Sequence, residues 1–173
     1  ETSKESPELL VSAYKDNVAF IKGPEMLQFA QQAETGGARA DYFEVKAVPS
    51  VISLKAETHN FPTTVEPFYG ASNGSGGEIR DRMAGGRGSI PLIGTAVYMT
   101  SYSRLQGSRS VQWEKHTKPR NWKYQTPQQI LTKASNGASD FGNKFGQPLI
   151  TGSLLTGEIK TRRAFYGYDR AVM

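Results

Sequence analysis

Hydrophobic and polar residues alternate loosely over positions 11–22, and this alternation, with its many β-formers, predicts one strand or two short ones. Pro24 favours the start of a helix, because the first helical turn makes no use of the N–H group that proline lacks. We expect a helix over 25–33 that ends at Gly36 and Gly37. Its apolar face would consist of Met26, Phe29, Ala30 and Ala33.

The next apolar runs are short, as strands are. Positions 42–48 and 51–56 are predicted strands with a proline between them. Positions 90–99 form an apolar run between turn signals, which predicts a buried strand. The glycine-rich section 70–88 is predicted to be mostly loop, with room for a helix that begins near Gly77.

The clearest helix begins at Thr126, which can cap it, and at Pro127, which suits the first turn. Gly137 weakens the middle of this helix by about 1 kcal/mol relative to alanine. The apolar spacing nevertheless continues to about Asn143, and a further strand is predicted over 149–155. The residues that can share its apolar face are Ile130, Leu131, Ala134, Ala138 and Phe141.

Strands interleaved with two helices predict an α/β (α+β) fold, in which a mixed β-sheet is backed by helices. The length of 173 residues suits a single domain over 1–173. A hydrophobic fraction of 37% and a polar N-terminus without signal-peptide character predict a cytoplasmic protein. No apolar run approaches the roughly 18 residues of a membrane helix, so we expect no membrane partner. The absence of cysteine excludes disulfides and thiolate metal sites.

The charge is unevenly distributed. The net charge is +5, and six basic residues with one acid, Glu114, lie between Arg104 and Lys123. Such a concentrated basic segment attracts polyanions. Together with the aromatic residues Trp113, Trp122 and Tyr124, it makes a nucleic-acid-binding module an alternative interpretation.

The residues that carry most chemical information lie between positions 55 and 88. Lys55 and Glu57 are two apart at the end of a predicted strand, so both side chains can point into one cleft. His59 would share that side and is the candidate general base, because imidazole titrates nearest to neutral pH. The alternative is that His59 only bonds a loop carbonyl and has a structural role.

The stretch 70–77 contains few bulky side chains. Such a turn leaves backbone N–H groups free for phosphate oxygens, although no Walker lysine follows. A flexible surface loop is the alternative.

Asp81 is a carboxylate of the kind that Mg²⁺ prefers beside phosphate oxygens, and Glu57 is the natural second ligand. Arg80 can bind phosphate through its two-pronged guanidinium. An ordinary exposed Arg–Asp pair is the alternative for these two residues. Arg82 and Arg87 can either touch phosphate or be solvated.

These residues resemble the phosphoribosylformylglycinamidine synthase family, in its long, glutaminase-fused form. The resemblance extends upstream to 11–17, and downstream to Trp113-Glu114 and to 141–148. Its motif consists of Lys55-x-Glu57-Thr58-His59-Asn60, Pro62-Thr63, Pro67-Phe68, Gly70-Ala71-x-x-Gly74-Ser75-Gly76-Gly77-Glu78-Ile79-Arg80-Asp81 and Gly86-Arg87-Gly88.

The resemblance implies an ATP-dependent C–N ligase of de novo purine synthesis, with ATP and Mg²⁺ as cofactors. The family converts formylglycinamide ribonucleotide and glutamine-derived ammonia to the formylglycinamidine ribonucleotide, and ATP is thought to activate the amide oxygen as an iminophosphate. The implied roles are His59 as proton acceptor; Glu57 and Asp81 on Mg²⁺; Thr58, Asn60 and Arg80 toward substrate; and Lys55, Gly70, Ala71, Gly74, Ser75, Gly76 and Gly77 toward ATP.

The chain departs from the family pattern in two respects. Phe61 stands where the family usually has a second histidine, and the chain is much shorter than the long enzyme. Without a cysteine it cannot hydrolyse glutamine by a thiolate route. The resemblance therefore implies one internal domain, inactive alone, whose partners are the remaining domains, including the glutaminase.

The implied fold is that of the N-terminal domain of the aminoimidazole ribonucleotide synthase-like superfamily. Such domains pair through their sheets, so an isolated chain is expected to form a homodimer. A different ATP-dependent synthase of this superfamily is an alternative, but those enzymes lack the combined motif. A nucleic-acid partner would leave Glu57, His59 and Asp81 without a role.

Overall fold

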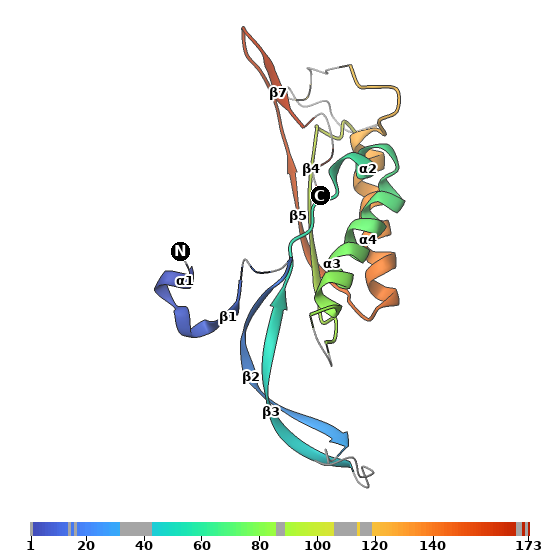
Figure 1. Ribbon diagram of the computed structural model, residues 1–173. Coiled ribbons are helices and arrows are strands. Elements are labelled where there is room, and N and C mark those ends of the chain that lie inside the picture. The colour runs from blue at the N-terminus through green and yellow to red at the C-terminus, as the bar shows by residue number, and fades with distance from the viewer. Residues whose placement is uncertain are drawn as a thin grey trace. The chain divides into compact units, whose positions relative to one another are not determined.

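The chain divides into two units, Glu1–Lys55 and Ala56–Met173, which we describe separately (Figure 1). The computed structural model describes residues 2–13, 15, 17–31, 43–85, 89–105, 114, 119–168, 171 and 173. Helices, antiparallel strands and a parallel strand pair backed by helices confirm the predicted α+β class. Within these residues, no helix has the length and apolar character needed to cross a membrane.

The first unit is built on an antiparallel sheet with the strand order β1-β2-β3. A short helix and a 3-10 turn precede the sheet. The elements are α1 (Thr2–Glu5), η1 (Pro7–Leu9), β1 (Leu10–Ser12), β2 (Ala19–Gln31) and β3 (Phe43–Leu54). The strands predicted within 11–22 are confirmed. Those predicted over 42–48 and 51–56 form one strand, β3, which runs through Pro49 and ends at Leu54, before the predicted end; residue 42 lies outside the described residues.

The helix predicted over 25–33 is wrong, because β2 runs through it to Gln31. The register with β3 shifts between Lys22 and Glu25, so a bulge accommodates Pro24, which cannot donate to a strand ladder. Beyond the bulge, Phe29 pairs with Val45 and stacks on Phe43 at 5.2 Å between ring centroids. Cross-strand pairing thus prevails over the helical spacing of apolar residues.

The second unit contains a strand–helix–strand arrangement. The elements are α2 (Asn60–Val65), α3 (Pro67–Met83), β4 (Gly94–Thr100), α4 (Pro127–Lys144), β5 (Leu149–Thr156), β6 (Glu158–Lys160) and β7 (Phe165–Gly167). Strands β4 and β5 are parallel, and helices α3 and α4 lie along one side of them (Figure 1). Ala71, Ala134 and Ala138 form the core between the helices, with Tyr98 and Leu149 of the strands packed against it.

The buried strand predicted over 90–99 is confirmed in part. It begins only at Gly94, and its burial alternates: Ala96 and Thr100 are buried, whereas Val97 is 41% exposed. The predicted strand over 149–155 is confirmed as β5, and the predicted helix from Thr126 is confirmed as α4. The side chain of Thr126 accepts a hydrogen bond from the N–H of Gln129 at 3.2 Å within a capping box.

The loop predicted over the glycine-rich section is wrong for its larger part, because Pro67–Met83 is helical. The glycines serve close packing. A Cβ on Gly70 would lie 2.5 Å from the N of Thr63, and one on Gly76 would lie 2.8 Å from Cζ of Phe141. On the facing helix, a Cβ on Gly137 would lie 2.0 Å from the O of Phe68. Glycine is therefore required where α3 meets its neighbours.

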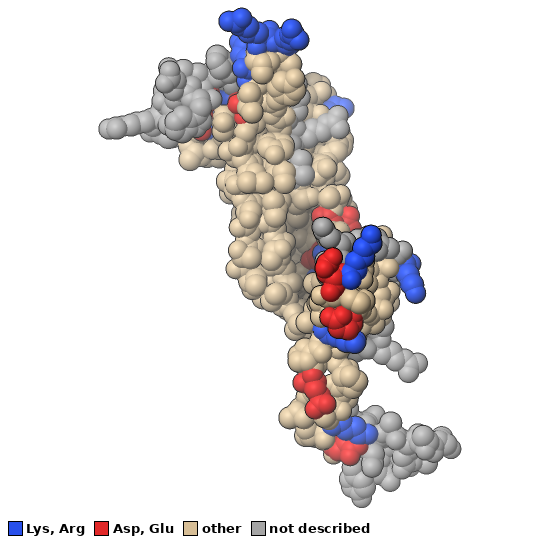
Figure 2. Space-filling model, turned by 90° about the vertical axis from the view of Figure 1, so that its left-hand side faces the viewer, with Lys and Arg blue, Asp and Glu red and all other residues tan. Residues whose placement is uncertain are grey.

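The second unit ends in an antiparallel hairpin, β6–β7. Its turn is fixed by Thr161, whose Oγ1 accepts from the N–H of Ala164 at 2.9 Å. The hairpin tip is one place where Lys and Arg gather on the surface (Figure 2), and its cations are Lys160, Arg162 and Arg163, all exposed.

Tyr98 makes the free energy of unfolding of the second unit depend on pH. Burial raises the pKa of Tyr98 from 10.0 to about 12. The pKa of Tyr98 is higher in the folded state than in the unfolded state. The contribution of Tyr98 to the stability of the fold is therefore present below pH 10 and is lost as the pH rises to 12. We expect Tyr98→Phe to remove about 1–2 kcal/mol of this pH dependence, allowing for partial solvent screening.

Urea unfolding measured between pH 9 and pH 12 tests the expected dependence of the unfolding free energy on Tyr98. Tyr166→Phe, at a tyrosine that is 60% exposed, is the matched control. An equal pH dependence in wild type and Tyr98→Phe would contradict the assignment.

Candidate functional site

The candidate site is built where the segment leading into α2 meets α3. His59 is the residue immediately before α2, and its backbone N–H donates to the O of Met173 at 3.2 Å. Thr63 Oγ1 donates to the O of His59, which fixes the start of the helix. The backbone of His59 is therefore held at both its N–H and its carbonyl.

The side chain of His59 contacts α3. Its Nε2 lies 2.9 Å from Nδ2 of Asn73. A Cβ on Gly74 would lie 2.9 Å from Cβ of His59, so the glycine allows the histidine this close approach. Sequence reasoning missed Asn73. The signal that could have identified it is its spacing of four residues from Gly77 and eight from Asp81 along one helix.

Glu57 and Arg80 meet near Gly77. A Cβ on Gly77 would lie 3.8 Å from Cγ of Glu57 and 3.8 Å from Nη2 of Arg80. Asp81 is four residues beyond Gly77 and half-buried, and its side chain leans toward the preceding turn. The structure thus places His59 beside Asn73 and Gly74, and Glu57 and Arg80 beside Gly77, while Asp81 lies one turn beyond Gly77 on α3.

The carboxylates near Gly77 suit a cation that takes its remaining ligands from a phosphate group. Within the described residues, no group of three or more His, Asp or Glu side chains could hold a metal ion by itself. Glu57 beside Gly77 and Asp81 one turn further supply two carboxylates. Mg²⁺ in phosphate sites commonly uses one or two carboxylates and takes its other ligands from phosphate and water. The residues therefore fit Mg²⁺ bound together with a phosphorylated ligand.

The glycine-rich turn expected at 70–77, whose backbone N–H groups would bind phosphate, is not formed, because this stretch is helical. The N–H of Gly70 donates to the O of Glu66 at 2.8 Å, and the amides that follow lie inside α3. Gly77 alone of the six predicted ATP contacts in this stretch is not buried; the others are Gly70, Ala71, Gly74, Ser75 and Gly76. The backbone amides of this stretch are therefore engaged within the helix rather than turned toward a ligand.

The other predicted site residues differ in their surroundings. Thr58 is exposed, and its N–H donates to Oε1 of Glu57 at 3.3 Å. Asn60 Oδ1 accepts from the N–H of Met173 at 3.2 Å. Lys55 is the last residue of the first unit. Phe61 is 50% exposed and meets Tyr124 edge-on, with ring centroids 6.4 Å apart.

Arg82 belongs to a polar cluster that fixes the end of α3. Its Nη2 lies 3.0 Å from Oε2 of Glu78 and also donates to Oε1 of Gln147. Gln147 is 1% exposed and donates to Oε1 of Glu78, so the three side chains satisfy one another. This arrangement resolves the ambiguity of Arg82 in favour of a structural role; Arg87 lies outside the described residues.

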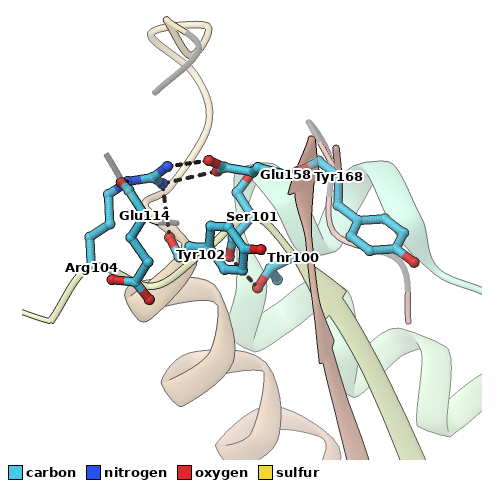
Figure 3. A network of polar contacts seen from close by, with 7 residues as sticks. All are labelled: Thr100, Ser101, Tyr102, Arg104, Glu114, Glu158 and Tyr168. Carbon is cyan, nitrogen blue, oxygen red and sulfur yellow. Dashed lines mark hydrogen bonds and ion pairs between the residues drawn. The ribbon is translucent and has the colours of Figure 1, made fainter. Parts of the chain in front are cut away.

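The basic stretch 104–123 lies largely outside the described residues, but Arg104 is described. Its guanidinium faces the carboxylate of Glu158 in a two-pronged ion pair, with Nη1 2.9 Å from Oε1 (Figure 3). It also donates to the carbonyls of Tyr102 and Glu114, at 3.1 and 2.9 Å. Arg104 has a left-handed backbone (φ 47°), and these contacts hold it there.

Neighbouring polar contacts tie the end of β4 to the hairpin. Ser101 Oγ donates to the O of Tyr168 at 2.8 Å, and Thr100 Oγ1 donates to the O of Ser101 (Figure 3). Further along the stretch, Lys123 Nζ lies 5.2 Å from the ring of Trp122. Arg104 and Lys123 thus contact groups of the chain itself; Arg109, Lys115 and Lys118 lie outside the described residues.

No protein-family model matches the chain.

Proposed function

We propose that the chain is an ATP- and Mg²⁺-binding domain of a C–N ligase, phosphoribosylformylglycinamidine synthase, and acts in the cytoplasm. The observation that carries this proposal is the position of Glu57 and Arg80 beside Gly77, with Asp81 one turn further along α3 and the side chain of His59 against the same helix. Two carboxylates and an arginine suit a metal–phosphate ligand. The sequence motif between Lys55 and Gly88 supports the choice of this synthase over other members of its superfamily.

Each side chain has a role in this proposal. Glu57 and Asp81 would hold Mg²⁺ with the phosphates of ATP, and Arg80 would bind a phosphate oxygen. Bound Mg²⁺ would neutralise charge on the transferring phosphoryl group. Thr58 and Asn60 lie at the start of α2 beside Glu57 and His59, where a substrate amide could be bound. Ammonia would come from the glutaminase domain of the complete enzyme.

Calorimetric titration with a non-hydrolysable ATP analogue tests the proposal. We expect binding that requires Mg²⁺ and that falls by about tenfold or more in Arg80→Gln, because a charge-assisted phosphate contact is lost. Lys144→Gln, at a lysine that pairs with Asp140 on α4, is the control.

The same titration with single-stranded RNA examines the alternative function. RNA affinity that falls steeply with salt, without Mg²⁺-dependent nucleotide binding, would favour a nucleic-acid module. No heat with either ligand would remove an independent ATP site from this chain.

The proposed partners include a second copy of the chain. Val97 of β4 and Leu155 of β5 are 41% and 48% exposed, while Ala96 in the same sheet is buried. Parallel strands are normally covered on both faces, and among the described residues of the second unit nothing covers the face opposite the helices. Pairing of two such faces would cover it.

Light scattering of the isolated chain is expected to give the mass of two chains. Val97→Glu should shift the mass toward one chain, because it buries a charge in the pair. Leu92→Glu, at a residue 66% exposed outside the strands, should leave the mass unchanged. A single-chain mass for the wild type at all concentrations would contradict the pairing.

A further inference from the structure

The hairpin β6–β7 presents cations at its tip and an apolar pair directly behind them. Lys160, Arg162 and Arg163 are exposed, and all three lie in the turn or next to it. Ile159 and Tyr166 pair directly across the two strands, so they share one face, on which they are 63% and 60% exposed. The tip of the hairpin therefore combines three positive charges with one exposed aromatic ring.

The cations of the hairpin are not balanced by acidic residues of its own. The segment 159–168 has a net charge of +3, because it contains three Lys and Arg residues and no Asp or Glu. Glu158 at the base has a side chain that is 5% exposed, and it engages Arg104 in the two-pronged ion pair of Figure 3. The one carboxylate beside the hairpin is thus already neutralised by a residue outside it.

Polar contacts fix both ends of the hairpin. At the tip, Thr161 Oγ1 accepts from the N–H of Ala164 at 2.9 Å, and the N–H of Thr161 donates to the O of Ala164 at 2.8 Å. At the base, Ser101 Oγ donates to the O of Tyr168 at 2.8 Å (Figure 3). A surface that is ordered before binding loses less conformational entropy when a ligand binds. The cations are therefore presented from a fixed backbone.

We propose that the hairpin tip binds single-stranded nucleic acid, with Lys160, Arg162 and Arg163 on phosphates and Tyr166 stacked on a base. A guanidinium group matches two phosphate oxygens in its planar, two-pronged geometry. Proteins that bind single strands without sequence preference combine a cationic surface with aromatic rings in this manner. The surface is distinct from the basic stretch 104–123, and the proposal does not depend on the proposed function.

The order of charged and apolar side chains along the hairpin disfavours an anionic membrane as the partner. A segment bound to a membrane buries its apolar side chains more deeply than its cations, which stay among the headgroups. Here Arg162 and Arg163 occupy the tip, and Ile159 and Tyr166 lie behind them. A nucleic-acid strand carries a phosphate beside every base, so cations and a neighbouring ring can engage it together.

Fluorescence anisotropy of a labelled oligouridylate, titrated with the whole chain at several salt concentrations, tests the proposal. Three phosphate contacts predict a slope of about −2 for log affinity against log salt, because each contact on a single strand contributes roughly −0.7. Arg162→Gln combined with Arg163→Gln should reduce the slope to about −0.7. Tyr166→Ala should lower the affinity roughly tenfold through lost stacking, whereas Tyr166→Phe, which keeps the ring, should bind like the wild type.

A matched double substitution controls for net charge. Lys133→Gln combined with Lys144→Gln removes two charges from exposed positions on α4 and should leave the slope unchanged. Equal losses of affinity in the two double variants, or no binding of the oligouridylate by the wild type, would overturn the proposal. Binding to phosphatidylserine vesicles or to polyglutamate that needs both arginines, without binding to the oligouridylate, would overturn it in favour of a membrane or an acidic protein.

Discussion

Replacing Gly137 by alanine is expected to destabilise the second unit by at least about 2 kcal/mol. The added Cβ would lie 2.0 Å from the O of Phe68 and 2.7 Å from its C, both backbone atoms. A backbone cannot rotate away as a side chain can, so α3 and α4 would have to separate. Alanine also favours the helix by about 1 kcal/mol, but this gain is smaller than the cost of overpacking. Gly70→Ala, which meets the backbone of Thr63, should behave similarly.

Urea unfolding of the purified chain measures the difference in unfolding free energy. Gly77→Ala is the matched control, since its Cβ would meet its nearest neighbours at 3.8 Å, an ordinary contact. This control should be neutral or stabilising by up to about 1 kcal/mol. Equal effects of the substitutions at Gly137 and Gly77 would show that α3 and α4 are not in close backbone contact.

Asp81→Asn is expected to lower turnover of the complete enzyme by about 100-fold or more, because it removes one of the two carboxylates proposed to hold Mg²⁺. Asparagine has nearly the same shape, so the fold should be retained. The apparent affinity for Mg²⁺ should fall in parallel, and raising the Mg²⁺ concentration should restore part of the activity. Steady-state kinetics at several Mg²⁺ concentrations measure both effects.

Asp140→Asn provides the comparison for Asp81. Asp140 lies on α4 and pairs with Lys144 at 2.7 Å in an exposed i, i+4 ion pair, which contributes little to stability. We expect wild-type kinetics in this variant. Wild-type kinetics in Asp81→Asn as well would remove Asp81 from the metal site and leave Glu57 without its proposed partner.

Local signals in the sequence were sufficient where the structure depends on local contacts. Thr126, Pro127 and Gln129 identify the start of α4 because a capping box involves only residues within one turn. Strand β5 was predicted from its own apolar run. In both elements the short-range preference agrees with the tertiary packing, so nothing distant alters the outcome.

The wrong predictions concern elements that distant contacts determine. Pro24 and the spacing of Met26 and Phe29 fit a helix, but pairing with Phe43–Leu54 makes this segment a strand. The glycines of α3 fit a loop, yet they are helical because Thr63, Phe141 and the facing α4 require small residues at the contact. A single sequence does not display which residues will meet across space.

The motif singled out Glu57, His59, Arg80 and Asp81 as site residues; the structure places Glu57 and Arg80 beside Gly77 and His59 against α3. The contact with Asn73 depends on the helical form, because four-residue spacing aligns side chains only in a helix. That is why sequence reasoning found the charged residues and missed the amide.

The glycine content of α3 has a consequence for how the unit folds. Gly70, Gly74, Gly76 and Gly77 each cost about 1 kcal/mol of helix propensity relative to alanine, so α3 has little tendency to form by itself. Helix α4, with its capping box, can form first and provide the surface on which α3 becomes ordered. Asn73, Arg80 and Asp81 therefore depend on packing against α4 for their places on α3, and a variant that loosens this packing is expected to displace them together.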